Sequence, residues 1–333
     1  MTFEDWRDVN PGELAPLYAV ECERYRVLLG WDLEPSCRII EEARRAGRLP
    51  GLALRGPGGE IAGWAFFVVH DGVLQIGGLV ADSAARLRRL IDRVLQSPEA
   101  AFARAMSAFV FPVSSSLQSA FERQRFAVER HPYLSRAIGG KAQTGEAQPE
   151  LAAEFRRRTL MEVDPADVVR LTARSYAGLP EARCFAADGR LDQWAHYLGQ
   201  LLATPACGRY LPEVSFAIER RDSRQVVGAV ITTAIAPGTA HIAQIVVEPA
   251  CRRSGLARVL IASVLSAAGG AGYSHLSLIV AENNAPAQRL YAHLGFQETA
   301  SFIFASRAAL TRRATPPPLS SRELVETNLR SAR

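Results

Sequence analysis

The stretch HIAQIVVEPACRRSGLARVLIASVLSAAGGAGYSHLSLIVAENNAPAQRLYAHLGF, from His241 to Phe296, decides the fold. Its first nine residues are mostly β-branched and apolar, which predicts a buried strand that Pro249 ends, because proline has no backbone donor. From Leu256 onward the apolar residues recur at helical spacing. A second strand and a second helix complete the stretch, so the expected order is strand, turn, helix, strand, helix.

The turn CRRSGLAR, Cys251 to Arg258, lies where the first of these helices begins. Unpaired amides and the helix dipole attract an anion at such a position, and Gly255 lets a ligand approach the main chain closely. The turn is neither of the common phosphate motifs, since it has no G-x-x-x-x-G-K-[ST] and no G-x-G-x-x-G. We predict a pyrophosphate cradle made by Arg252, Arg253, Ser254, Gly255, Leu256, Ala257 and Arg258.

This turn resembles the acetyl-CoA loop of the GNAT superfamily of N-acetyltransferases, Q/R-x-x-G-x-G/A, with Arg252, Gly255 and Ala257 at the specified positions. The segment LSLIVAENNAPAQRLYAHLGF, Leu276 to Phe296, resembles the strand, asparagine, helix, tyrosine and Gly-Phe succession that follows in the family. The two motifs stand in the right order, about thirty residues apart as a βαβ unit requires. An unrelated Rossmann-type repeat is the alternative interpretation.

The resemblance implies where acetyl-CoA, the expected co-substrate, would bind. Its pantetheine arm would lie along Ile245, Val246 and Val247, with the backbone amide near Ile245 facing the thioester carbonyl. Asn284 would hydrogen-bond the pantetheine amides, although an asparagine before a helix can also be a plain N-cap. Tyr291 would protonate the leaving thiolate, although its ring could equally be core packing.

His241 is the candidate general base. It begins the strand at the position where histone acetyltransferases of this superfamily have a Glu and serotonin acetyltransferases a His. An unperturbed pKa near ~6.5 would leave it half protonated at cell pH. An exposed, idle histidine at a loop edge and a water chain without a dedicated base are the alternatives. The implied reaction is direct attack by a primary amine through a tetrahedral intermediate, with no metal.

The first half of the chain repeats the second. Laying Gly63 on Gly228 and Val80 on Val247 aligns two strand meanders and brings Phe126 near Phe296. We expect an α+β (mixed α/β) protein of two tandem GNAT folds, each a mixed, largely antiparallel central sheet flanked by helices. A strand pair from 127 to 138 would close the first fold.

The repeat fails at the positions that carry the resemblance. No glycine stands at the cradle position in residues 81–86, Ser114 replaces Asn284, and Phe121 replaces Tyr291. The expected organisation is a degenerate GNAT-like domain without acetyl-CoA loop at 1–140, a catalytic domain at 151–312 and a Pro-rich tail at 313–333. The tail is expected to be disordered or weakly docked, with a short C-terminal helix as the alternative.

Composition fits an ordinary globular protein: 333 residues, 48% hydrophobic and 22% charged. The net charge of +5 suits an anionic cofactor, but the positive residues are dispersed, so we expect no nucleic-acid partner. The five cysteines are scattered without a C-x-x-C, which predicts reduced thiols. No apolar run is long enough to span a bilayer. We expect a cytoplasmic protein without membrane association, as a monomer or homodimer.

The resemblance places the acceptor site at the first two helices of the catalytic half and their loop, Arg174 to Trp194, here named the acceptor loop. It mixes aromatic residues with Glu181, Asp188 and Asp192, so a cationic amine would suit it. The acceptor is expected to be a small-molecule or peptide amine of unidentified structure. Two other functions compete: a non-catalytic acyl-CoA-binding sensor and a mycothiol synthase-like acetyltransferase. The presence of both His241 and Tyr291 argues against the sensor.

Overall fold

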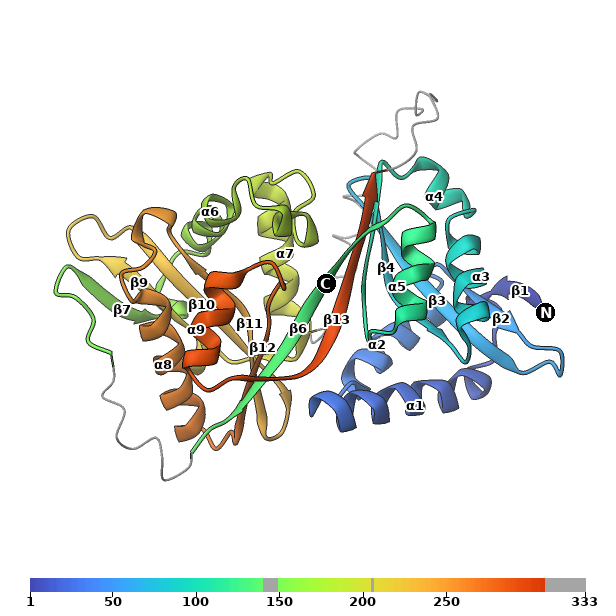
Figure 1. The fold of residues 1–333 in the computed structure, drawn as a ribbon, viewed down its shortest axis with the longest axis horizontal. Helices are drawn as coiled ribbons and strands as arrows, with labels where there is room; N and C mark the ends of the chain where they lie inside the picture. The colour runs from blue at the N-terminus through green and yellow to red at the C-terminus, as the bar shows by residue number, and fades with distance from the viewer. Residues whose placement is uncertain (140–148, 205–206, 309–333) are drawn as a thin grey trace.

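The computed structural model describes residues 1–139, 149–204 and 207–308 of the chain, so the predicted Pro-rich tail lies outside the described residues. The strands form one mixed 13-stranded sheet with helices on both faces (Figure 1). Within the described ranges, no helix combines the length and the apolar composition needed to cross a bilayer.

The N-terminal half contains the predicted helix pair, meander, helix, strand and helix, together with a short helix, α4, that was not predicted. Its elements are β1 (Thr2–Asp5), α1 (Pro11–Leu29), α2 (Glu34–Arg45), β2 (Gly51–Arg55), β3 (Ile61–His70), β4 (Val73–Ala81), α3 (Ala84–Val94), α4 (Pro98–Phe102), β5 (Ala105–Val110), α5 (Ser115–Arg123) and β6 (Ala127–Ala137).

The C-terminal half repeats this order with a second meander and a second pair of helices on each face. Its elements are β7 (Phe155–Thr159), α6 (Pro165–Tyr176), α7 (Leu191–Ala203), β8 (Arg209–Tyr210), β9 (Phe216–Arg220), β10 (Val226–Ala236), β11 (Thr239–Val247), α8 (Leu256–Gly270), β12 (His275–Ile279), α9 (Ala285–His293) and β13 (Gln297–Ala308).

The last strands of the two halves are exchanged across the centre of the sheet. The strand order is β1-β2-β3-β4-β5-β13-β6-β12-β11-β10-β9-β7. The long strands β6 and β13 therefore cross side by side between the halves (Figure 1). The expectation of a strand pair from 127 to 138 was wrong, because this segment is a single strand whose neighbours, β12 and β13, both come from the other half. Each half would expose an unpaired strand edge without the other.

A β-bulge lies at the same place in both halves. Ala243 is the extra residue of β11 opposite Ile231 and Thr232, and Gly77 is the extra residue of β4 opposite Phe66 and Phe67. In each half the parallel ladder to the next strand ends just before the bulge. A bulge bends its strand and increases its twist, so both halves repeat a point where two parallel strands separate.

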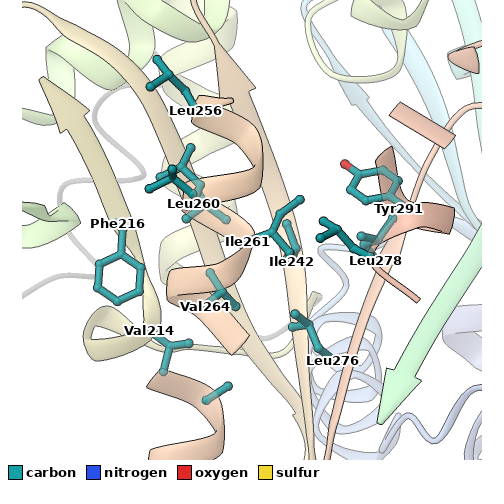
Figure 2. Close-up of a cluster of buried hydrophobic side chains, with 14 of the residues drawn as sticks. Val214, Phe216, Ile242, Leu256, Leu260, Ile261, Val264, Leu276, Leu278 and Tyr291 are labelled. Atoms are coloured by element: carbon teal, nitrogen blue, oxygen red, sulfur yellow. The ribbon is translucent and has the colours of Figure 1, made fainter. Parts of the chain in front are cut away.

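Buried apolar side chains form separate clusters on the two faces of the sheet. In the C-terminal half, α8 and α9 cover one face with Leu260, Ile261 and Val264 over Ile242 and Leu278 (Figure 2), whereas α6 and α7 cover the other face. The N-terminal half has the same two layers around α3 and α5 and around α1 and α2.

His131 lies in β6 where it pairs with β13, 5% exposed and packed edge-on against Phe109 and Phe304. Its Nε2 is buried and has no hydrogen-bond partner among the described residues. Burial lowers the pKa of His131 to about 4, so the ring is neutral at pH 7.

We expect acidification to destabilise the fold through His131. Below pH ~6.5 the unfolded chain binds a proton that the folded chain refuses, which costs about 1.4 kcal/mol per pH unit until the folded pKa is reached. His131→Leu removes this group and its unpaired nitrogen, so its unfolding free energy should fall less steeply from pH 6.5 to pH 4. Urea unfolding across this range measures the difference, and equal slopes in both proteins would contradict the assignment.

Candidate active site

Two parallel strands separate in the C-terminal half, so that the end of β11 has no strand partner on one side among the described residues. β11 and β12 pair from Thr239 to Ile242, and the ladder then stops. The chain after β12 follows β6 instead, because Val280 donates its amide to the Pro132 carbonyl at 3.1 Å. The end of β11, Ala243 to Val247, stays with β10.

The register decides which amides face this opening. Glu248 donates its backbone amide to the Val227 carbonyl at 2.8 Å, across the pair of β11 with β10. Successive residues of a strand direct their amides to opposite sides. The amides of Val247 and Ile245 therefore point away from β10, to the side where β12 has diverged. Val246 points its amide into the β10 ladder. Of the three residues predicted to contact the pantetheine arm, Val246 is therefore the one whose backbone amide is least available for a hydrogen bond to that arm.

The segment from Cys251 to Arg258 leads into α8, which begins at Leu256, so Ser254 and Gly255 lie at the helix start as predicted. Gly255 is the N-cap residue in the left-handed region, with φ of 85°, and a Cβ built on it would meet no atom of the described part of the chain within 4 Å. The turn is held by Ser254, whose Oγ donates to the Cys251 carbonyl at 2.5 Å. Arg253 and Arg258 are exposed beside it. An open, positively charged helix N-terminus results.

Two members of the predicted cradle have structural roles. The guanidinium of Arg252 donates to the Ser175 carbonyl at 2.7 Å and so fastens the turn to α6. Leu256 is 2% exposed and its side chain packs in the core under α8. Only the backbone of Leu256 can line the cradle.

Asn284 and Tyr291 begin and end the first two turns of α9. The Asn284 side chain accepts a hydrogen bond from the Ala287 amide at 3.3 Å, so it is an N-cap, and its amide nitrogen is directed elsewhere. Tyr291 is 6% exposed, packs edge-on against Phe296, and turns its hydroxyl towards α8 and β11 (Figure 2). Burial and the nearby Tyr176 hydroxyl raise the pKa of Tyr291, which keeps its phenol protonated.

His241 does not lie at an exposed loop edge. The ring is 4% exposed, and its Nδ1 lies 2.9 Å from the Ser277 Oγ in the adjacent strand β12. Trp31 and Tyr133, both from the N-terminal half, pack on the ring at centroid distances of 5.3 and 6.1 Å. Burial lowers the pKa of His241 to about 3, so the imidazole is fully neutral at pH 7 and cannot produce a titration near pH 6.5.

Sequence reasoning missed a polar group next to the opening. Gln244 is buried in β11 and its amide nitrogen donates to the Tyr176 hydroxyl at 3.0 Å, while its oxygen accepts from the Tyr197 hydroxyl at 3.3 Å. Tyr176 also packs on Trp194 at 5.1 Å. The sequence feature that could have identified this group is a single glutamine, Gln244, among the mostly apolar residues of the strand. These contacts connect the acceptor loop to the strand that borders the opening.

Charged side chains of the acceptor loop form ion pairs with the N-terminal half. Asp188 pairs with Arg104 of the N-terminal half at 2.5 Å, and Arg190 bridges Asp192 and Asp71 at 2.9 and 2.8 Å. The pKa of Asp188 is lowered chiefly by its hydrogen bond with Arg104. Asp188 and Asp192 are thus already neutralised, which removes the reason to expect a cationic acceptor from them.

The equivalent point in the N-terminal half is built differently. Ser83 caps α3 by accepting from the Arg86 amide at 3.3 Å, and the carboxylate of Asp82 pairs with Arg86 beside this helix start. A Cβ on Gly77 would lie 2.2 Å from the Phe66 ring, so an aromatic side chain covers the bulge. Ser114 caps α5 as Asn284 caps α9, and Phe121 is fully buried.

Comparison with known proteins finds one family that matches the segment containing this site. Residues 180–296 match the family described as the acetyltransferase (GNAT) family. This range contains β11, the cradle, α8, β12, Asn284 and Tyr291. No curated protein was found to match the sequence.

Solved structures share the architecture of most of the chain. A GCN5-related N-acetyltransferase from Sphaerobacter thermophilus is 16% identical with a TM-score of 0.63, covering 92% of this chain and 96% of that one. A tandem GNAT protein from the clavulanic acid biosynthesis pathway is 15% identical with a TM-score of 0.55, covering 79% and 84%. A GNAT-family acetyltransferase from Colwellia psychrerythraea is 15% identical with a TM-score of 0.51, covering 92% and 100%. At these identities the likeness shows the fold.

Proposed function

The chain belongs to the GNAT acetyltransferase family through its C-terminal half, and from this premise we propose that it transfers the acetyl group of acetyl-CoA to a primary amine. The observation that carries the proposal is the open edge of β11, which ends at the uncapped helix start of Gly255 and is flanked by the Tyr291 hydroxyl. A pantetheine arm needs a free strand edge, and a pyrophosphate needs free helix amides.

The residues present fit acetyl-CoA, which supplies the acetyl group already activated as a thioester. Among the described residues, no atom lies within 4 Å of the position of a Gly255 Cβ, so a phosphate can approach the main chain there. The amides that open α8 and the exposed Arg253 and Arg258 would hold it. The amides of Ile245 and Val247 would hold the pantetheine arm and the thioester carbonyl.

Three groups of the protein supply the oxyanion donor, the general acid and the general base. The amide near Ile245 stabilises negative charge on the carbonyl oxygen. Tyr291 remains protonated and donates to the leaving sulfur. His241 is neutral and accepts the proton of the attacking amine. Its Nδ1 lies 2.9 Å from the Ser277 Oγ, and Nε2 is the accepting atom when Nδ1 is the donor in that bond.

In this proposal residues 151–312 are the catalytic domain and residues 1–140 a degenerate one without cofactor. Two observations support the division. The serine cap and the acidic Asp82 at α3 disfavour an anion, and the Phe66 ring covers the bulge. The N-terminal half instead covers the acceptor face beside His241 with Trp31 and Tyr133.

Thiol release tests the proposed function. The protein is incubated with acetyl-CoA and a panel of primary amines, including amino sugars, amino acids, polyamines, aryl amines and peptide N-termini, and free CoA is measured with a thiol reagent. We expect release that depends on both protein and amine, and none from the Gly255→Glu variant. Acetyl-CoA binding without release for every amine class would favour an acyl-CoA sensor.

A further inference from the structure

Two cysteines lie against each other between the first two helices of the chain. The Sγ atoms of Cys22 in α1 and Cys37 in α2 are 3.6 Å apart. Both side chains are partly exposed, and both are free thiols in the structure. A disulfide holds its sulfurs about 2.05 Å apart, so an approach of about 1.5 Å would allow these two to bond.

The segment that joins these helices reaches across to the C-terminal half. Residues 30–33 connect α1 to α2. Within them, Trp31 packs on the imidazole of His241 with 5.3 Å between the ring centroids. Asp32 donates its backbone amide to the Ile235 carbonyl in β10 at 2.7 Å. The connection between the two cysteine-bearing helices therefore also covers the candidate base.

This cover must move before an amine can reach the imidazole. The His241 ring is 4% exposed and lies beneath Trp31 and Tyr133. A general base has to come within hydrogen-bond distance of the group whose proton it takes. Tyr133 belongs to a central strand that pairs on both sides, whereas Trp31 lies on a connection between two helices. Trp31 is therefore the part of the cover that can be displaced.

A low-molecular-weight disulfide such as oxidised glutathione can oxidise the two thiols. The thiolate of one cysteine attacks this oxidant, which forms a mixed disulfide and releases one glutathione thiolate to take up the proton. The sulfur of the other cysteine then attacks the protein sulfur of the mixed disulfide and releases the second glutathione. The protein loses two hydrogen atoms with two electrons, and the oxidant becomes two thiols.

The surroundings of the pair make this exchange slow but favour its product. Burial raises the pKa of both thiols, and the carboxylates of Glu21 and Glu34 raise it further. Few thiolates are therefore present at pH 7 to start the exchange. Thiolates also stabilise the reduced form of a thiol pair, so their scarcity favours the disulfide once it has formed.

We propose that Cys22 and Cys37 are a modification site, at which a reversible disulfide ties α1 to α2, holds Trp31 over His241 and so limits access of the acceptor amine. The effect on access rests on the proposed function, in which His241 is the base. Formation of the disulfide rests only on the placement of the two sulfurs.

Disulfide formation can be measured without activity. The full chain is equilibrated with mixtures of oxidised and reduced glutathione, its remaining thiols are alkylated, and intact mass and peptide mapping identify the product. We expect the loss of two hydrogen atoms and a peptide linked through Cys22 and Cys37, both reversed by dithiothreitol. Because the fold holds the sulfurs together, the folded chain should need roughly 10-fold less oxidised glutathione than the chain unfolded in urea.

Cysteine variants show which thiols react. Cys22→Ala and Cys37→Ala should each form no internal disulfide, whereas the matched control Cys207→Ala should form it like the unaltered protein. Mixed disulfides with glutathione and no internal disulfide would overturn the inference. Equal oxidation of the folded and the unfolded chain would overturn it as well.

The oxidised and the reduced protein, freed of glutathione, are then compared in amine-dependent loss of the acetyl-CoA thioester. Oxidation should lower kcat/KM for the amine roughly 2- to 30-fold with unchanged acetyl-CoA affinity, and Cys37→Ala should not respond to the same treatment. A disulfide that forms without changing the amine kinetics would overturn the inference. Absence of turnover in the reduced protein with every amine would refute the proposed function and the effect on access, whereas the mass measurement decides separately on the disulfide.

Discussion

Gly255→Glu is expected to abolish acetyl-CoA binding. The substitution places a side chain and a negative charge in the open space above the first turn of α8, where the pyrophosphate would meet the helix amides. The φ of 85° adds strain of about 1–2 kcal/mol for any residue with a Cβ, which a folded domain can tolerate. Calorimetric titration with acetyl-CoA measures the loss.

Gly272→Glu provides the matched control at the other end of the same helix. Gly272 also has a positive φ, of 88°, and open space around it, so the variant carries the same side chain and the same strain. It should bind acetyl-CoA like the unaltered protein. Unchanged affinity in a folded Gly255→Glu protein would mean that the cradle is misplaced.

Tyr291→Phe is expected to lower kcat by about 10²- to 10⁴-fold, the usual value of general acid assistance, while acetyl-CoA affinity stays nearly the same. Only the hydroxyl is lost, because the ring packs against Phe296 and the equivalent Phe121 shows that phenylalanine fits this position of the fold. Steady-state kinetics of thiol release with the best acceptor measures the effect.

Tyr273→Phe serves as the control for Tyr291. Tyr273 packs against the same core cluster but follows the C-terminal end of α8, away from the cradle at its N-terminal end. It should keep full activity. Equal activity of Tyr291→Phe and the unaltered protein would assign Tyr291 to packing alone and leave protonation of the thiolate to water.

The local parts of the site could be predicted from the sequence because each depends on a short segment. The cradle needs only a strand end, Gly255 and a helix start, and the first turn of α9 needs only Asn284 before it. The meanders likewise follow from alternating residues and turns between them. The structure has the strand end, the two helix starts and the meander strands at the predicted places, whereas phosphate binding at the cradle stays a prediction.

The central strands could not be placed from the sequence. Each half ends in a segment, β6 or β13, whose composition is that of strands that close the sheet of that half. Nothing in the local sequence distinguishes pairing with strands of the same half from pairing with strands of the other half. Tyr133 was therefore not recognised as a neighbour of His241. The burial of His241 was missed for the same reason, because the rings that cover it come from the segment between α1 and α2 and from β6.

The acceptor loop shows a different limit. Its carboxylates suggested a cationic substrate, but Asp188 and Asp192 are paired with Arg104 and Arg190. A sequence shows the charges of a loop but not their partners, and the partner Arg104 is contributed by the other half. The ion pairs therefore belong to the junction between the halves.

The number of acetyl-CoA molecules bound per chain tests the central claim most directly, which is that one half binds the cofactor and the other completes the acceptor face. Isothermal titration of the full chain is expected to give a stoichiometry near one, lost in Gly255→Glu and retained when Ser83 is replaced by alanine. A stoichiometry near two, or loss of binding through Ser83→Ala with Gly255 intact, would contradict the account.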